Sequence, residues 1–148
     1  MKKKKCDWII EYVANGFRCK HTGKVQNPFP PYMCDAHTHG ICNYGHMEFQ
    51  LVLAYEANEV MRLLNTLGMR VAEGEHFKGG DLVEGLYLDC PILLREFTDI
   101  EGKTVLRLIV SDKFNRWPKE ADPPHCFQLL QTELLYQCNG HGGKQPIS

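Results

Sequence analysis

Histidine and cysteine residues crowd the segment between Cys34 and His46. Within this segment, His37 and His39 are two residues apart. Side chains of an extended strand repeat every second residue, so a strand here would place both imidazoles on one face. Two neutral imidazoles provide half of the ligands that zinc takes in proteins, and they also suit iron and nickel. His37 and His39 are therefore candidate ligands for zinc or another transition metal.

A third ligand could come from Cys42 or from His46, which return across the turn Asn43-Tyr44-Gly45. Three protein ligands would leave one coordination position for water, and a metal-bound water is a hydrolytic nucleophile. The pattern thus indicates a metal-binding protein or a metal-dependent hydrolase. It also fits a plain strand face on which the imidazoles form hydrogen bonds or meet solvent.

Composition limits the class of protein that could carry such a site. The chain has 148 residues, of which 43% are hydrophobic and 24% charged, as expected for one globular domain. Its 17 Lys and Arg against 18 Asp and Glu lack the basic excess of a nucleic-acid binder. No apolar run approaches the roughly 18 to 20 residues of a membrane span. We expect a cytoplasmic protein with no nucleic-acid or membrane partner.

Seven cysteines are many for a chain of this length. Thiols stay reduced in the cytosol, so these residues would be core fillers, reactive thiols or metal ligands rather than disulfides. A redox-sensitive thiol protein is therefore a further hypothesis.

One strong helix and a series of strands must position these groups. Apolar residues recur at helical spacing over about 57–73, and this amphipathic stripe predicts the main helix, with Asn58 as a candidate cap. A shorter stripe over about 7–15, between Asp7 and Asn15-Gly16, predicts a short N-terminal helix. The stripe of the main helix consists of Val60, Leu63, Leu64, Leu67 and Val71.

The remaining apolar segments read as strands. Residues 32–41 and 49–54 predict a hairpin, and 127–132 is a last strand or short helix. Strands gathered after one central helix favour an α+β fold with an antiparallel or mixed sheet, rather than alternating βαβ units. We expect a disordered basic start over 1–6, a single domain over 7–136 and a flexible tail over 137–148. Further strands are expected at 82–88, 91–97 and 103–111.

The chain resembles the DUF4262 family, a set of small bacterial domains without an assigned activity, from about Asp7 to Glu133. Ala36-His37-Thr38-His39-Gly40-Ile41 is similar to the family's Ala-Tyr-Thr-Val-Gly-Leu, and Gly45-His46-Met47-Glu48-Phe49 is similar to its Gly-His-Pro-Glu-Leu. Further likeness lies in the leading helix that ends at Gly16-Phe17, in Pro30-Pro31, in Ala72-Glu73-Gly74-Glu75, in the turns from Phe77 to Gly85, in Pro91 and in Phe127-Gln128-Leu129.

The resemblance implies that the matched polar residues either bind a small ligand or satisfy backbone groups of the turns. Those positions are Thr38, His46, Glu48 and Gln128, with Gly40 and Gly45 beside them. The family pattern has Tyr and Val where this chain has His37 and His39, so the resemblance does not imply the imidazole pair.

Two functional expectations follow. The first is a domain that binds a small ligand or a protein partner near the hairpin at 32–48, including a second copy of itself through an exposed sheet edge. The second is a metal site built on His37 and His39. The sequence leaves open whether the chain is an enzyme.

Overall fold

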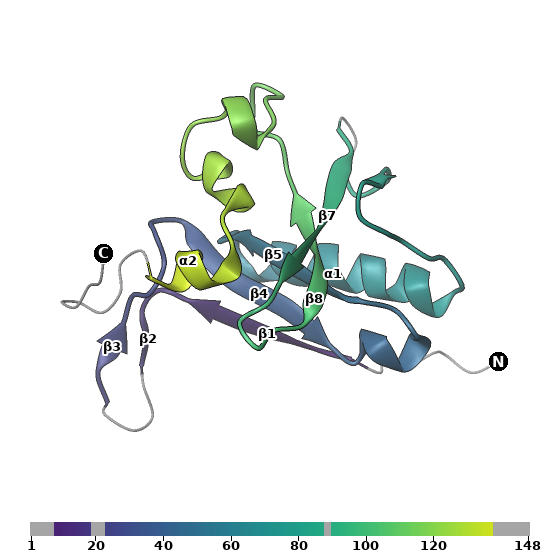
Figure 1. Cartoon of the computed structure of the whole chain (residues 1–148), viewed down its shortest axis with the longest axis horizontal. Helices are drawn as coiled ribbons and strands as arrows, with labels where there is room; N and C mark the ends of the chain where they lie inside the picture. The colour runs from purple at the N-terminus through teal and green to yellow at the C-terminus, as the bar shows by residue number, and fades with distance from the viewer. Residues whose placement is uncertain (1–7, 19–22, 88–89, 138–148) are drawn as a thin grey trace.

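The structure, a computed structural model, describes residues 8–18, 23–87 and 90–137. Its main feature is a six-stranded mixed sheet with one long helix on it, which confirms the predicted α+β class (Figure 1). In spatial order, the strands of this sheet are β1 (Ile9–Ala14), β4 (Met33–His39), β5 (Glu48–Leu53), β8 (Thr104–Ile109), β7 (Ile92–Thr98) and β6 (Leu82–Val83).

The sheet consists of two antiparallel groups of three strands. In the first group β4 lies between β1 and β5, and in the second β7 lies between β8 and β6. The groups meet where β5 pairs with β8 in parallel. The helix after β5 provides part of the long connection that a parallel pair requires.

The prediction of a short N-terminal helix over 7–15 is wrong, because Ile9–Ala14 form the edge strand β1. Asp7, the predicted cap of that helix, lies outside the described residues. All six residues of β1 pair with β4 in antiparallel register. The polar stop at Asn15-Gly16 is real but ends a strand: the Asn15 amide bonds both backbone groups of Phe29, at 3.0 and 2.9 Å, and Gly16 has φ 90°. The spacing of the apolar residues in this segment suits a helix, but its β-branched residues suit a strand equally well. Pairing with β4 decides in favour of the strand.

The main helix is confirmed as α1 (Ala57–Ala72). It begins after Glu56 rather than at Asn58, and it ends where Gly74, at φ 111°, lets the Glu75 amide return to the Arg70 carbonyl. All five predicted stripe residues are buried: Val60, Leu63, Leu64, Leu67 and Val71.

Close packing joins α1 to the start of the sheet. Trp8, just before β1, is buried, and its indole N–H donates to the Asn65 side chain at 2.9 Å. The ring lies so near the helix backbone that a Cβ at Gly68 would be 2.6 Å from it. A side chain at position 68 would therefore collide with the Trp8 ring.

The predicted hairpin at 32–41 and 49–54 is confirmed as the antiparallel pair β4 and β5. Its connection is longer than the expected turn, since Gly40 leads into the 3-10 helix η1 (Ile41–Tyr44). The expected strands at 91–97 and 103–111 are confirmed as β7 and β8, whereas only Leu82–Val83 of the expected strand at 82–88 is extended. Leu88 lies outside the described residues.

The C-terminal segment crosses the face of the sheet opposite α1 (Figure 1). The strand or short helix expected at 127–132 is helical, as part of η3 (His125–Leu129) and the start of α2 (Thr132–Gln137). The remaining elements are the hairpin β2 (Phe17–Arg18) and β3 (Val25–Gln26), and the 3-10 helix η2 (Pro118–Glu120).

Two domain-level expectations fall on parts that the structure does not cover. The basic start over 1–6 and the tail beyond Gln137 lie outside the described residues. Within 8–18, 23–87 and 90–137, no helix combines the length and the apolar character that crossing a bilayer would require.

Candidate functional site

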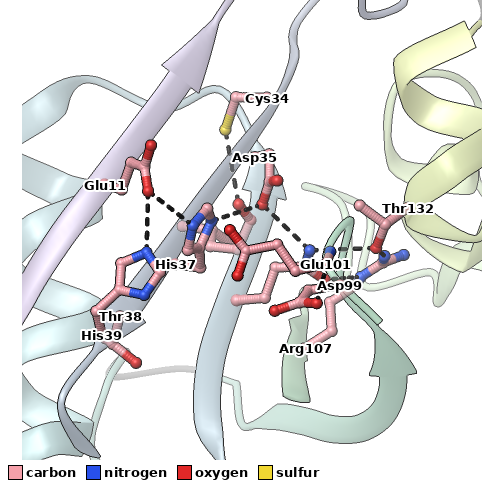
Figure 2. A network of polar contacts seen from close by, with 12 residues as sticks. Glu11, Cys34, Asp35, His37, Thr38, His39, Asp99, Glu101, Arg107 and Thr132 are labelled. Carbon is pink, nitrogen blue, oxygen red and sulfur yellow. Dashed lines mark hydrogen bonds and ion pairs between the residues drawn. The ribbon is translucent and has the colours of Figure 1, made fainter. Parts of the chain in front are cut away.

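Glu11, His37 and His39 converge on one face of the sheet (Figure 2). The β1–β4 register sets Glu11 opposite His37, and His39 follows two residues later on the same side. One oxygen of Glu11, Oε1, lies 3.3 Å from His37 Nε2 and 2.9 Å from His39 Nε2. One ligand atom from each residue lies within 4.8 Å of the other two. Among the described residues, this is the group whose ligand atoms could share one metal ion.

Asp35 holds the other nitrogen of His37. The two residues are on the same face of β4, and His37 Nδ1 lies 3.0 Å from Asp35 Oδ1. A neutral imidazole that donates Nδ1–H to this carboxylate keeps the lone pair of Nε2 toward Glu11 and His39. A carboxylate on the outer nitrogen of a histidine is the usual support of a metal-bound imidazole.

Charge and burial tune these groups in opposite directions. Burial alone would lower the pKa of His37, but the hydrogen bonds and charges of Asp35 and Glu11 outweigh it and raise that pKa above its usual value. Burial likewise opposes ionisation of Asp35, yet His37, Tyr136 and Gln50 hold its pKa below the usual range. The hydrogen bond from His39 is the main cause of the lowered pKa of Glu11. Without a metal, the site is therefore an acid–base cluster whose two carboxylates favour a positive charge on His37.

The cluster has a buried side and an open side. The His37 side chain is 9% exposed, whereas those of His39 and Glu11 are 37% and 55% exposed. A metal held by all three would thus meet protein behind His37 and solvent beyond the other two ligands.

A buried polar network continues from Asp35 into the molecule (Figure 2). The Gln50 amide donates to Asp35 Oδ1 at 3.2 Å, and its oxygen accepts from Arg107 Nε at 2.7 Å. All three side chains are fully buried. Burial lowers the pKa of Arg107 to about 9, against the opposing charge of Asp35, so the guanidinium is still a cation at neutral pH.

The C-terminal segment completes the bonds of Arg107. Its Nη1 donates to the backbone carbonyls of Gln128 and Leu130, each at 2.6 Å, and its Nη2 donates to Thr132 Oγ1 at 3.0 Å. The guanidinium also lies 3.7 Å from the centre of the Phe97 ring. Arg107 therefore fastens the segment around η3 and α2 to the sheet.

The expected third ligands, Cys42 and His46, are not in the cluster that the structure brings together. The chain turns at Gly40, and Cys42 lies exposed in η1 with its backbone N–H bonded to Glu48. His46 is buried elsewhere, with Nδ1 2.8 Å from the Met47 carbonyl and Nε2 accepting the Phe77 N–H at 2.9 Å. Glu11 takes their place.

The sequence pattern does not predict Glu11 as a ligand, because the spacing over 7–15 indicates a helix rather than a strand beside His37. The available signal is composition: Glu11 is the charged residue of β1, whose other residues are apolar or aromatic and suit a strand. Only the β1–β4 pairing, which a single sequence does not specify, brings it to His37.

Thr38 and Glu48, which the family resemblance highlights, bond each other. The Thr38 hydroxyl donates to Glu48 Oε1 at 2.7 Å. The same carboxylate accepts the backbone N–H groups of Gly40, Ile41 and Cys42 at 3.0 to 3.1 Å. Glu48 thus holds the start of η1 to the sheet, and these bonds overcome the cost of burial to lower its pKa.

Gln128 also uses its polar atoms within the chain. Its oxygen accepts the Val110 N–H at 2.7 Å, and its amide donates to the Val110 and His125 carbonyls at 2.8 and 2.9 Å. Ligand binding by Thr38, His46, Glu48 and Gln128 stays a prediction, and each of these side chains has a structural role in the fold.

The four described cysteines differ widely in exposure. Cys42 is exposed and Cys90 and Cys126 are half-buried. Cys34 is fully buried on the α1 face, and burial, aided by the charge of Asp35, raises its pKa to about 12. Its thiol is thus part of the core and is kept protonated.

The resemblance to the DUF4262 family stays a prediction, because the comparisons with known proteins do not bear on it. No family model, no curated protein and no solved structure matches this chain.

Proposed function

We propose that this chain is a metal-binding domain that holds one transition-metal ion on Glu11, His37 and His39. The observation that carries the proposal is the convergence of three ligand atoms from two neighbouring strands within 4.8 Å of one another. Asp35 adds the support behind His37 that metal-bound imidazoles require.

The ligand set favours particular ions. Two imidazoles and one carboxylate suit Zn²⁺, Fe²⁺, Co²⁺ or Ni²⁺, whereas Ca²⁺ and Mg²⁺ prefer sites made of oxygen. Both imidazole nitrogens already lie near the same Glu11 oxygen, so small side-chain adjustments would let one ion contact all three ligand atoms. Such an ion competes with protons for His37, and its affinity should fall in acid.

The test is direct binding of Zn²⁺ or Co²⁺ to protein purified without a nickel column and stripped with a chelator. Calorimetry should show one equivalent bound, and Co²⁺ should give visible absorption bands. Glu11→Gln and His39→Ala should each weaken binding at least about tenfold, since each removes one of three ligands.

Two matched controls separate this site from general metal affinity. Cys42→Ser changes the ligand expected from the sequence, and His76→Ala removes an exposed imidazole outside the cluster. Both should bind as the unchanged protein does. The proposal fails if the unchanged protein shows no saturable binding, or if a His37→Ala/His39→Ala double variant retains its affinity.

A second candidate function is metal-dependent hydrolysis. It is favoured by the number of ligands, because three protein ligands leave a position for water, and by the exposed side formed by Glu11 and His39. Zn²⁺-loaded protein should then cleave an activated ester faster than the His39→Ala variant at equal metal concentration. Equal rates would remove hydrolysis and leave metal binding standing.

A further inference from the structure

The C-terminal helix α2 is hydrogen-bonded to the residue that supports the candidate metal site. The Tyr136 hydroxyl donates to Asp35 Oδ2 at 2.6 Å. The other oxygen of Asp35 carries the contacts with His37 and Gln50. A chain of two hydrogen bonds therefore links α2 to His37.

Asp35 has no solvent to replace a lost partner. It is 0% exposed, so its carboxylate depends on these three neighbours for its orientation. The Tyr136 hydroxyl donates to Oδ2, while His37 and Gln50 contact Oδ1, so the three contacts together orient the plane of the carboxylate. Without the Tyr136 contact, the carboxylate can rotate about its Cβ–Cγ bond, and Oδ1 loses its fixed position against His37 Nδ1.

α2 itself is firmly placed over the sheet. At its start, Thr132 Oγ1 accepts hydrogen bonds from Gln50 at 3.3 Å and from Arg107 at 3.0 Å. Leu135 is fully buried, and the Tyr136 ring packs on Phe29 with centroids 4.7 Å apart. The hydroxyl is thus presented to Asp35 by a helix that is anchored at several points.

We propose that α2 sets the metal affinity of the Glu11–His37–His39 site, with Tyr136 as a positioning residue that acts through Asp35. This inference rests on the metal-binding function proposed above. Because coupling between two binding events is reciprocal, a bound metal stabilises the docked position of α2 by the same factor. The C-terminal segment is then a control element for the site rather than only a cover for the sheet.

The first test is Zn²⁺ affinity of the full chain with Tyr136→Phe, which removes one hydroxyl and keeps the ring on Phe29. Changes in the outer shell of metal sites cost about 10- to 100-fold in affinity. Tyr136 contacts Asp35 rather than a ligand itself, so we expect a loss of Zn²⁺ affinity at the lower end of this range, about tenfold. The Co²⁺ absorption bands should shift as well.

A matched control is Tyr12→Phe. Tyr12 also donates a hydrogen bond, but to the Tyr55 carbonyl at 2.7 Å rather than to Asp35. This variant should lose comparable stability and keep its metal affinity and Co²⁺ spectrum. Equal weakening by Tyr12→Phe and Tyr136→Phe would reduce the effect to general destabilisation and overturn the inference.

A second measurement needs no substitution. Zn²⁺ should slow amide hydrogen exchange in α2 of the unchanged protein, and Tyr136→Phe should abolish that slowing. If the unchanged protein binds Zn²⁺ while α2 exchange and the Tyr136→Phe affinity stay unaltered, the coupling is refuted and the metal site stands. If the unchanged protein binds no metal, the site and the coupling both fail.

Discussion

Glu11 and His37 face each other across the β1–β4 pair, with a carboxylate oxygen 3.3 Å from the imidazole Nε2. Asp35 contacts the other nitrogen of the same ring, so His37 lies between two carboxylates. This arrangement favours a cation on His37, whether a proton or a metal ion.

The metal-free protein should therefore show a proton-linked stability that depends on His37. Its folded-state pKa is raised above the unfolded value of about 6.5, so this stability is present below that pH and is lost as the pH rises through the folded pKa. His37→Gln should cost more free energy of unfolding at about pH 5.5 than at about pH 9. Urea unfolding with a chelator at both pH values measures the difference.

His125 is a control of opposite sign. Burial lowers its pKa despite the charge of Asp112, so its contribution is present above the unfolded pKa and is lost as the pH falls. His125→Gln should cost more at the alkaline pH. A His37→Gln cost that is independent of pH would contradict this account of the site.

Arg107 should be among the most sensitive positions for stability. Arg107→Met leaves the buried Gln128 carbonyl and Gln50 oxygen, and the partly buried Leu130 carbonyl, without their donor. Each buried acceptor without a partner costs about 1 to 3 kcal/mol. We expect a loss of about 3 kcal/mol or more in urea unfolding.

Arg95 is the natural comparison for Arg107. It is the register partner of Arg107 on β7, but it is exposed. Arg95→Met should change stability by only about 0.5 kcal/mol. Similar losses for the two variants would show that the buried network contributes little.

Glu48→Gln tests the bonds that hold the start of η1. An amide –NH₂ would then face two of the four donors that the carboxylate now accepts, which should cost about 2 kcal/mol at neutral pH. Because the pKa of Glu48 is lowered, the cost should shrink as the pH falls through that pKa, where the native carboxylate also protonates. Thermal unfolding from neutral to acid pH measures this, with exposed Glu84→Gln as the control. A cost that does not change with pH would contradict the role of the ionised carboxylate.

The sequence was sufficient for the elements whose pattern is local. The α1 stripe from Val60 to Val71 is unambiguous because its period of 3.6 residues lasts for three turns. The β4–β5 hairpin and the common face of His37 and His39 likewise follow from alternation within one strand.

What the sequence could not provide depends on pairing between distant segments. β1 carries apolar residues at spacings that suit either a helix or a strand, and its partner, β4, decides between them. The same holds for the third residue of the site: Glu11 is 26 positions from His37 in the chain, so only the pairing of β1 with β4 brings the two together. Cys42 is the candidate third ligand nearest to His39 in the sequence. The positive φ of Gly40, however, ends the strand and leads the chain into η1, so Cys42 does not reach the imidazoles.

The parallel pair β5–β8 joins the two antiparallel groups of strands, and Gln50 and Arg107 are register partners within it. A slip of this pair by one residue would leave Gln50 opposite an apolar neighbour and bury the guanidinium without an acceptor. Wrong alignments of the two halves are thereby penalised far more heavily than a purely hydrophobic seam would penalise them. The polar pair thus makes the assembly of the sheet selective for a single alignment, in addition to stabilising it once formed.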